Sequence, residues 1–436
     1  FTLMKTKLKE KINIVTLGCS KNLVDSEVLL TQLKGNNEEV YHQSNDINPD
    51  VVIINTCGFI DNAKQESIDT ILRYAKEKEE GNIKRLYVTG CLSERYKSDL
   101  EREIKEVDGF FGTRELPELL KTFEAKYRDD LIGERIITTE SHYAYMKISE
   151  GCDRPCSFCA IPLMRGKHIS KPIEEIILEA KNLVKNGVKE IMLIAQDSTY
   201  YGIDIYGKRV LPDLLRKLSD VEGLKWIKIH YAYPTGFPME IIEVMKERDN
   251  ICNYLDIPLQ HGSTKMLKIM RRGTSREKID RLIENIREIN PPISIRTTLI
   301  AGHPGETEKD FNEMYEFVEK NKFNRLGIFT YSHEEGTHSH SLVDDVPETL
   351  KRKRSNLIMS LQQKISFANN KNYIGKKLKI LIDRRDSKNY YGRTEFDSPE
   401  VDNEVIIPAM NSHLRIGDFS DILITEAKEY DLIGKI

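Results

Sequence analysis

Three cysteines lie close together in residues 150–159, EGCDRPCSFC, at the spacing C-x3-C-x2-C. Thiolates spaced this tightly on a loop can bind three irons of a four-iron cluster and leave the last iron free for an exogenous ligand. A zinc ribbon would need a second C-x2-C pair, which the sequence lacks. Pro155 stiffens the loop, and Phe158 can shield a cluster from water. We therefore predict an iron–sulfur site with the ligands Cys152, Cys156 and Cys159.

Short apolar segments around and beyond this motif alternate with amphipathic helical stretches. The expected strands are residues 145–148, 190–194, 226–229, 254–257, 294–299 and 326–329, and the clearest helices are residues 172–185, 211–218, 239–248, 276–289 and 308–320. Such alternation is typical of parallel βα units. We predict an α/β fold whose central part is a partial (β/α)6 barrel.

Polar residues and glycines follow several of these expected strands. They include Gln196-Asp197-Ser198, His230 with Tyr233, Gln260-His261 and the stretch 301–307. Sites in α/β barrels gather at the carboxyl ends of the strands. For any one of these residues, an ordinary loop with a helix cap is an equally good interpretation.

The first third of the chain also alternates strand and helix. The expected strands are residues 12–17, 50–55 and 85–89, and they lead into Gly18-Cys19, Cys57-Gly58 and Gly90-Cys91. The carboxyl ends of parallel strands share one edge, so we expect these three cysteines to converge. Glycine lets the backbone approach a bulky ligand. Three thiols without an adjacent histidine favour an iron–sulfur cluster over zinc; three buried core cysteines are the alternative.

The last part of the chain changes character. Residues 347–371 predict a charged connector helix, whose basic run 351–354 we interpret as a solvated face. Beyond it, short alternating segments predict a small antiparallel β-barrel, with strands at 377–382, 390–394, 405–407, 421–427 and 431–436.

The charge of this terminal module bears on its partner. Residues 372–436 hold 10 Lys and Arg against 12 Asp and Glu, and residues 395–404 carry five acids. We interpret these acids as an exposed face that repels phosphate and attracts a basic protein. The alternative is a merely solvated loop.

Composition bounds the remaining possibilities. The chain has 436 residues, 39% of them hydrophobic, and a net charge of -3, which exclude a disordered chain and a strongly basic nucleic-acid binder. Seven cysteines are too few and odd in number for a disulfide framework, so we expect a reducing cytoplasm. Residues 1–7 lack a signal-peptide pattern, and no apolar run is long enough for a membrane span. Cys252 is expected to be a packed core thiol, and we expect no metal ligation by His333, His338 and His340.

The motifs and their order resemble the methylthiotransferase family of radical S-adenosylmethionine (SAM) enzymes, whose terminal module is called TRAM. Residues 17–27 (LGCSKNLVDSE) and 392–402 (GRTEFDSPEVD) look like its RimO branch. The tRNA-modifying branch typically has Gln-Met-Asn where this chain has Lys-Asn-Leu. Ser20 departs from the usual proline but supplies no ligand. The expected domains are 10–125 (methylthiotransferase), 138–370 (radical SAM core with connector helix) and 372–436 (TRAM).

The resemblance implies two 4Fe-4S clusters, one on Cys152, Cys156 and Cys159 and one on Cys19, Cys57 and Cys91. The first would bind and cleave SAM, with Gln196, Asp197, Tyr233, Gln260, Gly302 and Phe158 around the cofactor. The second would supply sulfur to a substrate radical, and a second SAM the methyl group. Chemistry on an inert C–H bond needs such cofactors, in keeping with the lack of a recognisable acid–base pair.

The implied substrate is an aspartate β-carbon in the basic small-subunit ribosomal protein at the decoding centre. The implied partners also include an electron donor such as flavodoxin or ferredoxin. RNA contact through the C-terminal barrel is left open, and we expect a monomer without membrane association. The alternatives are a tRNA adenosine methylthiotransferase and, from another class, an iron–sulfur electron-transfer or scaffold protein.

Overall fold

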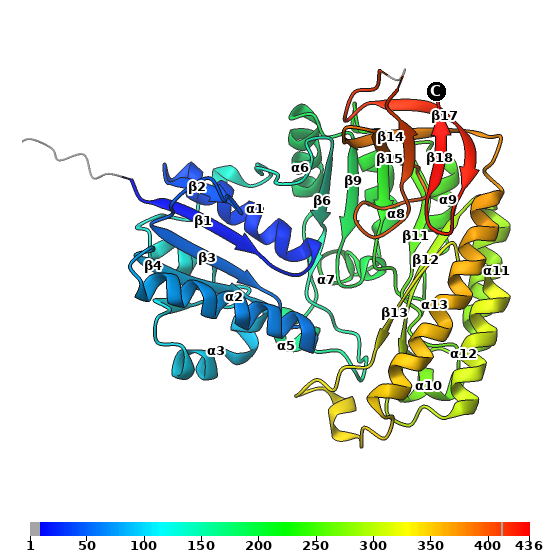
Figure 1. The fold of residues 1–436 in the computed structure, drawn as a ribbon, viewed down its shortest axis with the longest axis horizontal. Helices are drawn as coiled ribbons and strands as arrows, with labels where there is room; N and C mark the ends of the chain where they lie inside the picture. The colour runs from blue at the N-terminus through cyan, green and yellow to red at the C-terminus, as the bar shows by residue number, and fades with distance from the viewer. Residues whose placement is uncertain (1–8, 411–412) are drawn as a thin grey trace, which may run out of the picture. The chain divides into compact units, whose positions relative to one another are not determined.

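The computed structural model describes residues 9–410 and 413–436 of the chain, which divides into two compact units (Figure 1). The first unit comprises Phe1–Thr139, Glu150–Asp153 and Ala160–Ile169, and the second comprises Glu140–Ser149, Arg154–Cys159 and Ser170–Ile436. The expectation about residues 1–7 lies outside the described residues. Within the described ranges, no helix is both long and apolar enough to cross a bilayer. The predicted domain boundaries stay a prediction.

The first unit is built on a five-stranded, parallel sheet in the order β2-β1-β3-β4-β5. Its strands are β1 (Lys11–Thr16), β2 (Glu39–His42), β3 (Val51–Thr56), β4 (Arg85–Gly90) and β5 (Gly109–Phe110), and its helices are α1 (Ser20–Gly35), α2 (Asp61–Glu79), α3 (Cys91–Glu103), α4 (Leu116–Lys121), the 3-10 turn η1 (Asp129–Leu131) and α5 (Ile161–Arg165). The three predicted strands are confirmed. Strands β2 and β5 were not predicted from the sequence; they are short and lie at the two edges.

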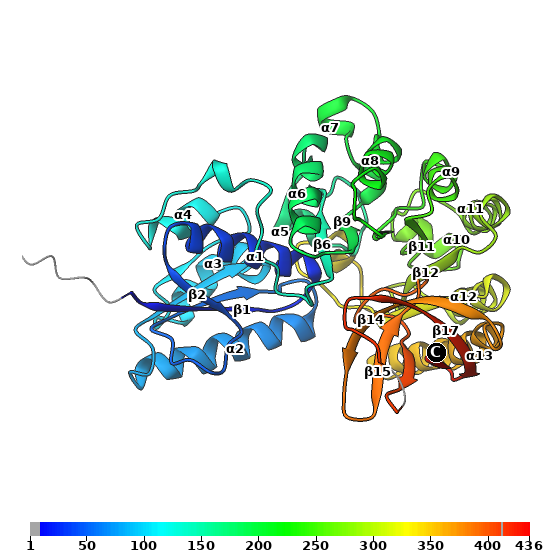
Figure 2. The same cartoon turned by 90° about the horizontal axis from the view of Figure 1, so that it is seen from above.

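The two opposite faces of this sheet carry separate hydrophobic clusters. Ile12, Ile14 and Ile53 pack with α1 and α4 on one face, whereas Ile54 and Val88 pack with α2 and α3 on the other. Figure 2 shows α1 and α2 on opposite faces. Strands buried on both sides have continuous apolar sequences, which is why the three central strands were predictable.

The second unit contains a six-stranded, parallel sheet in the order β13-β12-β11-β10-β9-β6. Its strands are β6 (Tyr143–Lys147), β9 (Glu190–Ile194), β10 (Trp226–Ile229), β11 (Ile251–Asp256), β12 (Ser294–Ala301) and β13 (Arg325–Thr330). All six predicted strands are present. The sheet is open, because β6 and β13 are its ends.

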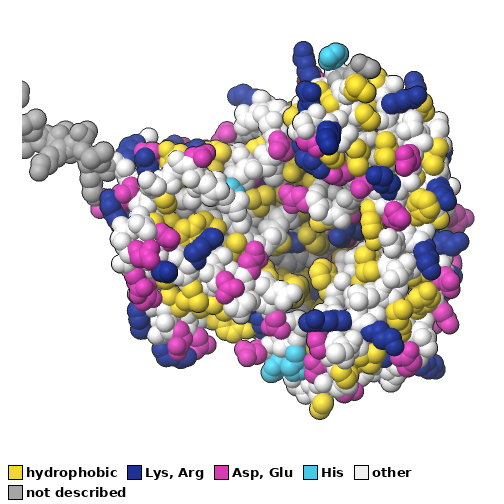
Figure 3. All heavy atoms as spheres, viewed as in Figure 1, with side chains coloured by type: hydrophobic (Ala, Val, Ile, Leu, Met, Phe, Trp, Pro, Cys, Tyr) yellow, Lys and Arg dark blue, Asp and Glu magenta, His cyan; other side chains and the backbone are white. Residues whose placement is uncertain are grey.

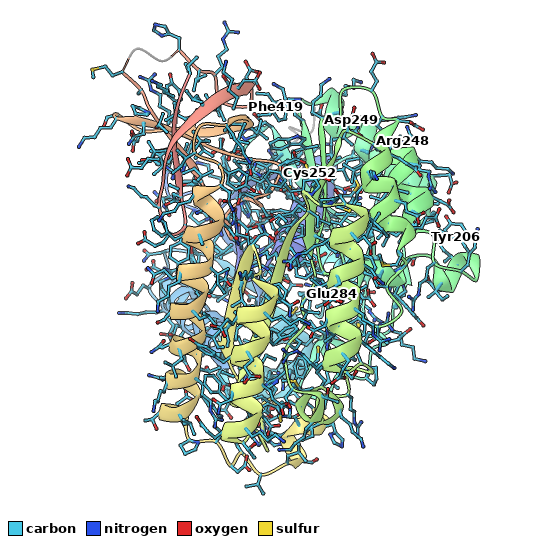
Figure 4. All side chains as sticks on the ribbon, turned by 90° about the vertical axis from the view of Figure 1, so that its right-hand side faces the viewer. Tyr206, Arg248, Asp249, Cys252, Glu284 and Phe419 are labelled. Carbon is cyan, nitrogen blue, oxygen red and sulfur yellow. The ribbon has the colours of Figure 1, made fainter. Side chains whose placement is uncertain are left out.

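Helices connect these strands at the positions that the sequence predicts. They are α6 (Ile173–Lys185), α8 (Leu211–Ser219), α9 (Glu240–Glu247), α11 (Arg276–Ile289) and α12 (Glu308–Asn321). Two short helices and two 3-10 turns were not predicted: α7 (Ile203–Tyr206), α10 (Thr264–Ile269), η2 (Ser198–Tyr200) and η3 (His338–Ser341). The structure also contains the short strands β7 (Ser149–Glu150) and β8 (Ile169–Ser170). The connector helix α13 (Glu348–Lys371) packs against α12, and α11, α12 and α13 lie side by side (Figures 1 and 4).

The C-terminal strands close into a five-stranded barrel in the order β14-β15-β16-β18-β17. They are β14 (Lys377–Arg385), β15 (Asn389–Arg393), β16 (Val405–Pro408), β17 (Phe419–Ala427) and β18 (Leu432–Lys435). One pair departs from the expected antiparallel arrangement, since β16 and β18 run parallel.

The acids between β15 and β16 do not form the exposed face that the sequence analysis expected. Asp397 is 2% exposed and accepts from Arg325 Nε at 2.8 Å. The Asp402 carboxylate is equally inaccessible and accepts from Arg296 Nε at 3.2 Å. Both arginines belong to the parallel sheet, so this loop docks the barrel onto the core. The interpretation of an acidic surface is therefore wrong for these two residues.

The basic run at the start of α13 is also only partly solvated. Lys351 is buried and its Nζ lies 2.6 Å from the Asp344 carboxylate. Arg354 is buried and lies 2.8 Å from the Glu306 carboxylate. Arg352 and Lys353, which lie between these two residues in the run, are exposed. The predicted solvated face is thus wrong for half of the run, because i, i+3 residues share one face of a helix and here face the core.

Cys252 lies in the interior, as expected. It is 1% exposed and packs with Trp226, Tyr254, Leu381 and Phe419, which join the sheet to the barrel. Figure 4 labels Cys252 and Phe419 in this region.

Candidate functional site

The structure brings Cys19, Cys57 and Cys91 together at the carboxyl ends of β1, β3 and β4. Cys19 precedes α1, Cys57 directly follows β3, and Cys91 is the first residue of α3. The three thiols are close enough that a negative charge on Cys19 or Cys57 raises the pKa of Cys91. None of the seven cysteines, all of which lie in the described ranges, forms a disulfide.

Glycines allow the three cysteine loops to approach one another. Gly18 has φ +90°, and a Cβ on it would lie 2.7 Å from Cys57 Cβ and 3.0 Å from Cys57 Sγ. A Cβ on Gly58 would lie 2.8 Å from the backbone of Leu92, which follows Cys91. These glycines were predicted to let the backbone approach a ligand; in the structure, they bring the loops against each other.

A buried arginine that the sequence analysis missed completes this group. Arg165 on α5 is 1% exposed, its Nη1 lies 2.6 Å from Asp25 Oδ2, and it also donates to Asn22 Oδ1. Asn22 Oδ1 in turn lies 3.7 Å from Cys91 Sγ. Arg165 follows Cys159 by only six residues in sequence, but nothing in that spacing indicates that it joins the N-terminal cysteines.

The environment of these thiols suits a metal cluster. Burial raises the pKa of Cys91 to about 12, an effect that the Arg165 charge opposes, and burial also raises the pKa of Cys57. Without metal these two thiols therefore stay protonated at neutral pH, whereas iron binds the thiolate. Arg165 offsets part of the negative charge that three thiolates would bring.

A single metal ion does not fit the described residues. Across the described ranges, no group of three or more His, Cys, Asp or Glu side chains is arranged to hold one ion. That His333, His338 and His340 bind no metal stays a prediction. A four-iron cluster places each thiolate on a different iron, so its ligands are further apart than those of one ion. The three-thiol donor set therefore fits a cluster.

The C-x3-C-x2-C loop passes from one unit to the other. Cys152 belongs to the first unit, where its N–H donates to the carbonyl of Gly166 at 3.0 Å. Cys156 and Cys159 belong to the second unit, where the Cys159 N–H donates to the Cys156 carbonyl at 3.2 Å. Between these two cysteines, the Ser157 N–H donates to the Met270 carbonyl at 3.1 Å. This bond fixes this half of the loop to the segment after α10.

The sulfur of Cys156 has two polar neighbours. Arg272 Nη1 donates to it at 3.2 Å, and the Tyr233 hydroxyl lies 3.7 Å away. The guanidinium groups of Arg154 and Arg272 both lie 4.2 Å from the centre of the Tyr233 ring. Burial raises the pKa of Tyr233, so its hydroxyl stays neutral. Tyr233 was predicted as a cofactor residue, whereas no sequence pattern indicated Arg272.

The other predicted cofactor residues also lie in the second unit, at the carboxyl ends of its strands. Gln196 and Asp197 follow β9; Asp197 accepts from Arg154 Nε at 2.7 Å and from the Thr199 N–H at 2.9 Å. Gln260 follows β11 in a left-handed conformation with φ 75°, and its buried Oε1 has no hydrogen-bond partner among the described residues. That unpaired acceptor fits a polar ligand such as the SAM amino group.

Gly302 and Phe158 have local packing partners. Gly302 follows β12, and a Cβ there would lie 2.2 Å from Lys351 Cγ, so its approach to α13 already requires glycine. Phe158 lies edge to face with His303, with ring centres 6.4 Å apart.

A hydrogen-bonded chain holds the motif loop from a further side. His303 Nδ1 donates to the carbonyl of Pro304 at 3.0 Å, so Nε2 accepts from Ser339 Oγ at 2.8 Å. Ser339 Oγ lies 2.9 Å from Ser157 Oγ, in the middle of the cysteine motif. The described residues thus converge on the Cys156 half of the motif from β10, β12, α10 and η3.

Comparison with protein families matches three segments of the chain. The Radical SAM superfamily model matches residues 146–318, the model described as "Uncharacterized protein family UPF0004" matches residues 11–112, and the TRAM domain model matches residues 374–436.

Curated relatives match almost the whole chain. The ribosomal protein uS12 methylthiotransferase RimO of Cytophaga hutchinsonii is 60% identical over 432 residues, 99% of this chain and 99% of that protein. The proteins of the same name from Flavobacterium johnsoniae and Bacteroides fragilis are 56% and 51% identical and cover 99% and 98% of this chain, and 100% and 99% of their own length.

Solved structures support the fold. The radical SAM methyltransferase TsrM from Kitasatospora setae, solved with cobalamin and a [4Fe-4S] cluster bound, aligns with a TM-score of 0.54 over 74% of this chain and 75% of that chain, at 13% identity. The cobalamin-dependent SAM radical enzyme OxsB aligns with a TM-score of 0.51 over 81% of this chain and 56% of its own, at 15% identity.

Proposed function

The chain belongs to the RimO family of radical SAM methylthiotransferases, and from this we propose that it inserts sulfur and a methyl group at the β-carbon of an aspartate in ribosomal protein uS12. The observation that carries the proposal is 60% identity over 99% of the chain to a curated uS12 methylthiotransferase. The two alternatives, a tRNA methylthiotransferase and an iron–sulfur scaffold, are not favoured, because the relatives described above are all uS12 enzymes.

We assign one 4Fe-4S cluster to Cys152, Cys156 and Cys159, and another to Cys19, Cys57 and Cys91. When bound, the clusters and SAM supply the one-electron chemistry, the sulfur and the methyl group that a C–H bond requires. The support for the first set is its C-x3-C-x2-C spacing. The support for the second is the convergence of three thiols at one sheet edge beside the Arg165 charge.

The residues of this chain then have defined tasks around the cofactors. Tyr233 and Arg154, whose guanidinium lies over the Tyr233 ring, line the strand ends with polar groups. Gln260 offers its unpaired Oε1 to the SAM that we assign there. We assign to Phe158, whose ring lies edge to face with His303, the task of shielding the cluster on Cys156 and Cys159 from water. We assign Gln196, Asp197 and Gly302 to the same cofactor pocket from their positions after β9 and β12.

Substituting one cysteine in each set tests the division of labour. With iron, sulfide, reductant and SAM, the full chain should add a methylthio mass to isolated uS12 and none to tRNA, as read by mass spectrometry. Cys156→Ala should abolish SAM cleavage, whereas Cys57→Ala should retain cleavage and lose sulfur insertion. Cys252→Ala is the matched control, because Cys252 is a packed thiol outside both sets. Equal behaviour of the Cys156 and Cys57 variants would refute the assignment, and modification of tRNA would move the chain to the other branch.

We also propose that the barrel contacts ribosomal RNA when uS12 is in the small subunit. Six exposed basic side chains lie on residues 376–388, and Figure 3 shows Lys and Arg over this region: Lys376, Lys377, Lys379, Arg384, Arg385 and Lys388. Such a surface binds phosphate in a salt-dependent way.

We further propose that the enzyme acts in the cytoplasm as a monomer and receives electrons from a flavodoxin or ferredoxin.

A further inference from the structure

Arg272, between α10 and α11, lies directly against a sulfur of the cysteine motif. The side chain is buried, Nη1 donates to Cys156 Sγ at 3.2 Å, and Nη2 donates to the Pro258 carbonyl at 2.5 Å. We propose that Arg272 is a positioning residue that sets the reduction potential of the cluster on Cys156 through this N–H···S hydrogen bond and its charge. The inference rests on the proposed function in that it takes Cys156 as a cluster ligand.

The positive charge of the buried Arg272 guanidinium requires a negatively charged partner, which Cys156 Sγ can supply. Among the described residues, no carboxylate lies within ion-pair distance of this guanidinium, and its buried Nε has no hydrogen-bond partner. The carboxylate that contributes to its electrostatics, Asp197, is already bound by Arg154 and Thr199. A buried cation without a counter-charge is strongly destabilising. The remaining candidate is Cys156 itself, which is anionic when it binds iron.

The position of Arg272 is fixed by both its backbone and its side chain. Its N–H donates to the Leu267 carbonyl at 2.9 Å. Its own carbonyl accepts from the Tyr233 hydroxyl at 3.1 Å and from Thr235 Oγ1 at 2.7 Å. The Tyr233 ring then covers one face of the guanidinium. Because these contacts leave the side chain little freedom, the N–H···S geometry is preorganised.

The direction of the effect follows from charge. Reduction adds an electron to a cluster whose sulfurs carry much of the negative charge, and hydrogen bonds to those sulfurs are among the determinants of its potential. A donor and a positive charge at Cys156 stabilise the reduced state more than the oxidised state. Arg272 therefore raises the reduction potential and increases the reduced fraction of the cluster at a given ambient potential.

The test uses the full chain with Cys19, Cys57 and Cys91 replaced by Ala, so that only the motif cluster is loaded. Iron content and an EPR-monitored redox titration are compared for the parent, Arg272→Met, Arg272→Lys and Arg271→Met. Arg271 is the adjacent, exposed arginine, and its variant is the matched control. We expect similar iron content and an Arg272→Met potential at least about 59 mV more negative, a tenfold change for a one-electron couple. Arg272→Lys should lie in between, and Arg271→Met should match the parent.

Each outcome decides the matter. An unchanged potential in Arg272→Met with full iron content overturns the proposal. If Arg272→Met loses iron, the Arg272→Lys potential decides; loss of iron in both variants assigns Arg272 to assembly and overturns the tuning role. A parent that binds no iron would instead refute the cluster assignment on which the proposed function rests.

Discussion

His303 is a single residue whose surroundings predict a pH dependence. It is 0% exposed, and burial lowers its pKa to about 4. An unfolded histidine titrates near 6.5. Because the folded pKa is the lower one, the unfolded chain binds the proton first as the pH falls. The contribution of neutral His303 to stability is complete above pH about 6.5 and decreases below it, by about 2 kcal/mol at pH 5.

Replacing this histidine should remove that dependence. We expect the difference in urea-unfolding free energy between pH 7 and pH 5 to be about 2 kcal/mol smaller in His303→Gln than in the parent, both measured without clusters. His413→Gln is the control, because His413 is exposed. The same pH dependence in the parent and in His303→Gln would contradict the burial argument.

At the residue scale, the sequence predicted cysteines better than arginines. Cys19, Cys57 and Cys91 could be found because each directly follows a recognisable strand, and parallel strands bring such positions to one edge. Arg165 and Arg272 could not, because each reaches its cysteine through contacts between elements far apart in the chain. Few local patterns distinguish an arginine that will be buried from one that will be solvated.

At the element scale, the loop between β15 and β16 should contribute to stability. Asp397 is buried against Arg325, whereas Glu400 in the same loop is exposed. Asp397→Asn leaves a buried guanidinium without its counter-charge, which costs about 3 kcal/mol. Glu400→Gln removes the same charge from the surface and should change stability by less than about 0.5 kcal/mol. Urea unfolding measures both, and equal losses would argue against burial of the Asp397 pair.

The same loop explains a wrong prediction. A run of acids such as residues 395–404 is most often solvated, so the sequence analysis made it an acidic surface. The basic partners Arg296 and Arg325 lie about 70 to 110 residues earlier and belong to strands whose apolar pattern gave no sign of a buried charge. A protein substrate is supported by the family. The physical reason first given for it, an exposed acidic surface on the barrel, was incorrect.

At the scale of the whole molecule, elements were more predictable than their docking. Every predicted strand and helix of the second unit is present, because burial on a sheet or along a helix face leaves a period in the sequence. The contact between barrel and core leaves no such period, since it is made by isolated charges and one small apolar cluster. Arg393 of the barrel lies 2.7 Å from Glu190 of β9, and the Lys228 Nζ lies 2.6 Å from the same carboxylate, all buried.

This buried network predicts that barrel and sheet unfold together. The one tryptophan of the sequence, Trp226, reports on their contact, because its ring lies 4.8 Å from that of Phe419 in the barrel. Arg393→Met leaves Glu190 with one cation in place of two, so the free energy of unfolding should fall by about 3 kcal/mol. The loss should appear as one shifted transition in Trp226 fluorescence and in circular dichroism.

An exposed barrel arginine provides the comparison. The Arg384 side chain is 51% exposed and lies 2.7 Å from Glu404, so Arg384→Met should cost less than about 1 kcal/mol. A separate, earlier fluorescence transition in Arg393→Met, with the circular dichroism of the sheet unchanged, would mean that the barrel undocks by itself. Since Arg393, Glu190 and Lys228 are all buried, undocking would expose three charges and the Trp226 cluster at once. We therefore expect the two modules to remain one cooperative unit up to the denaturation midpoint.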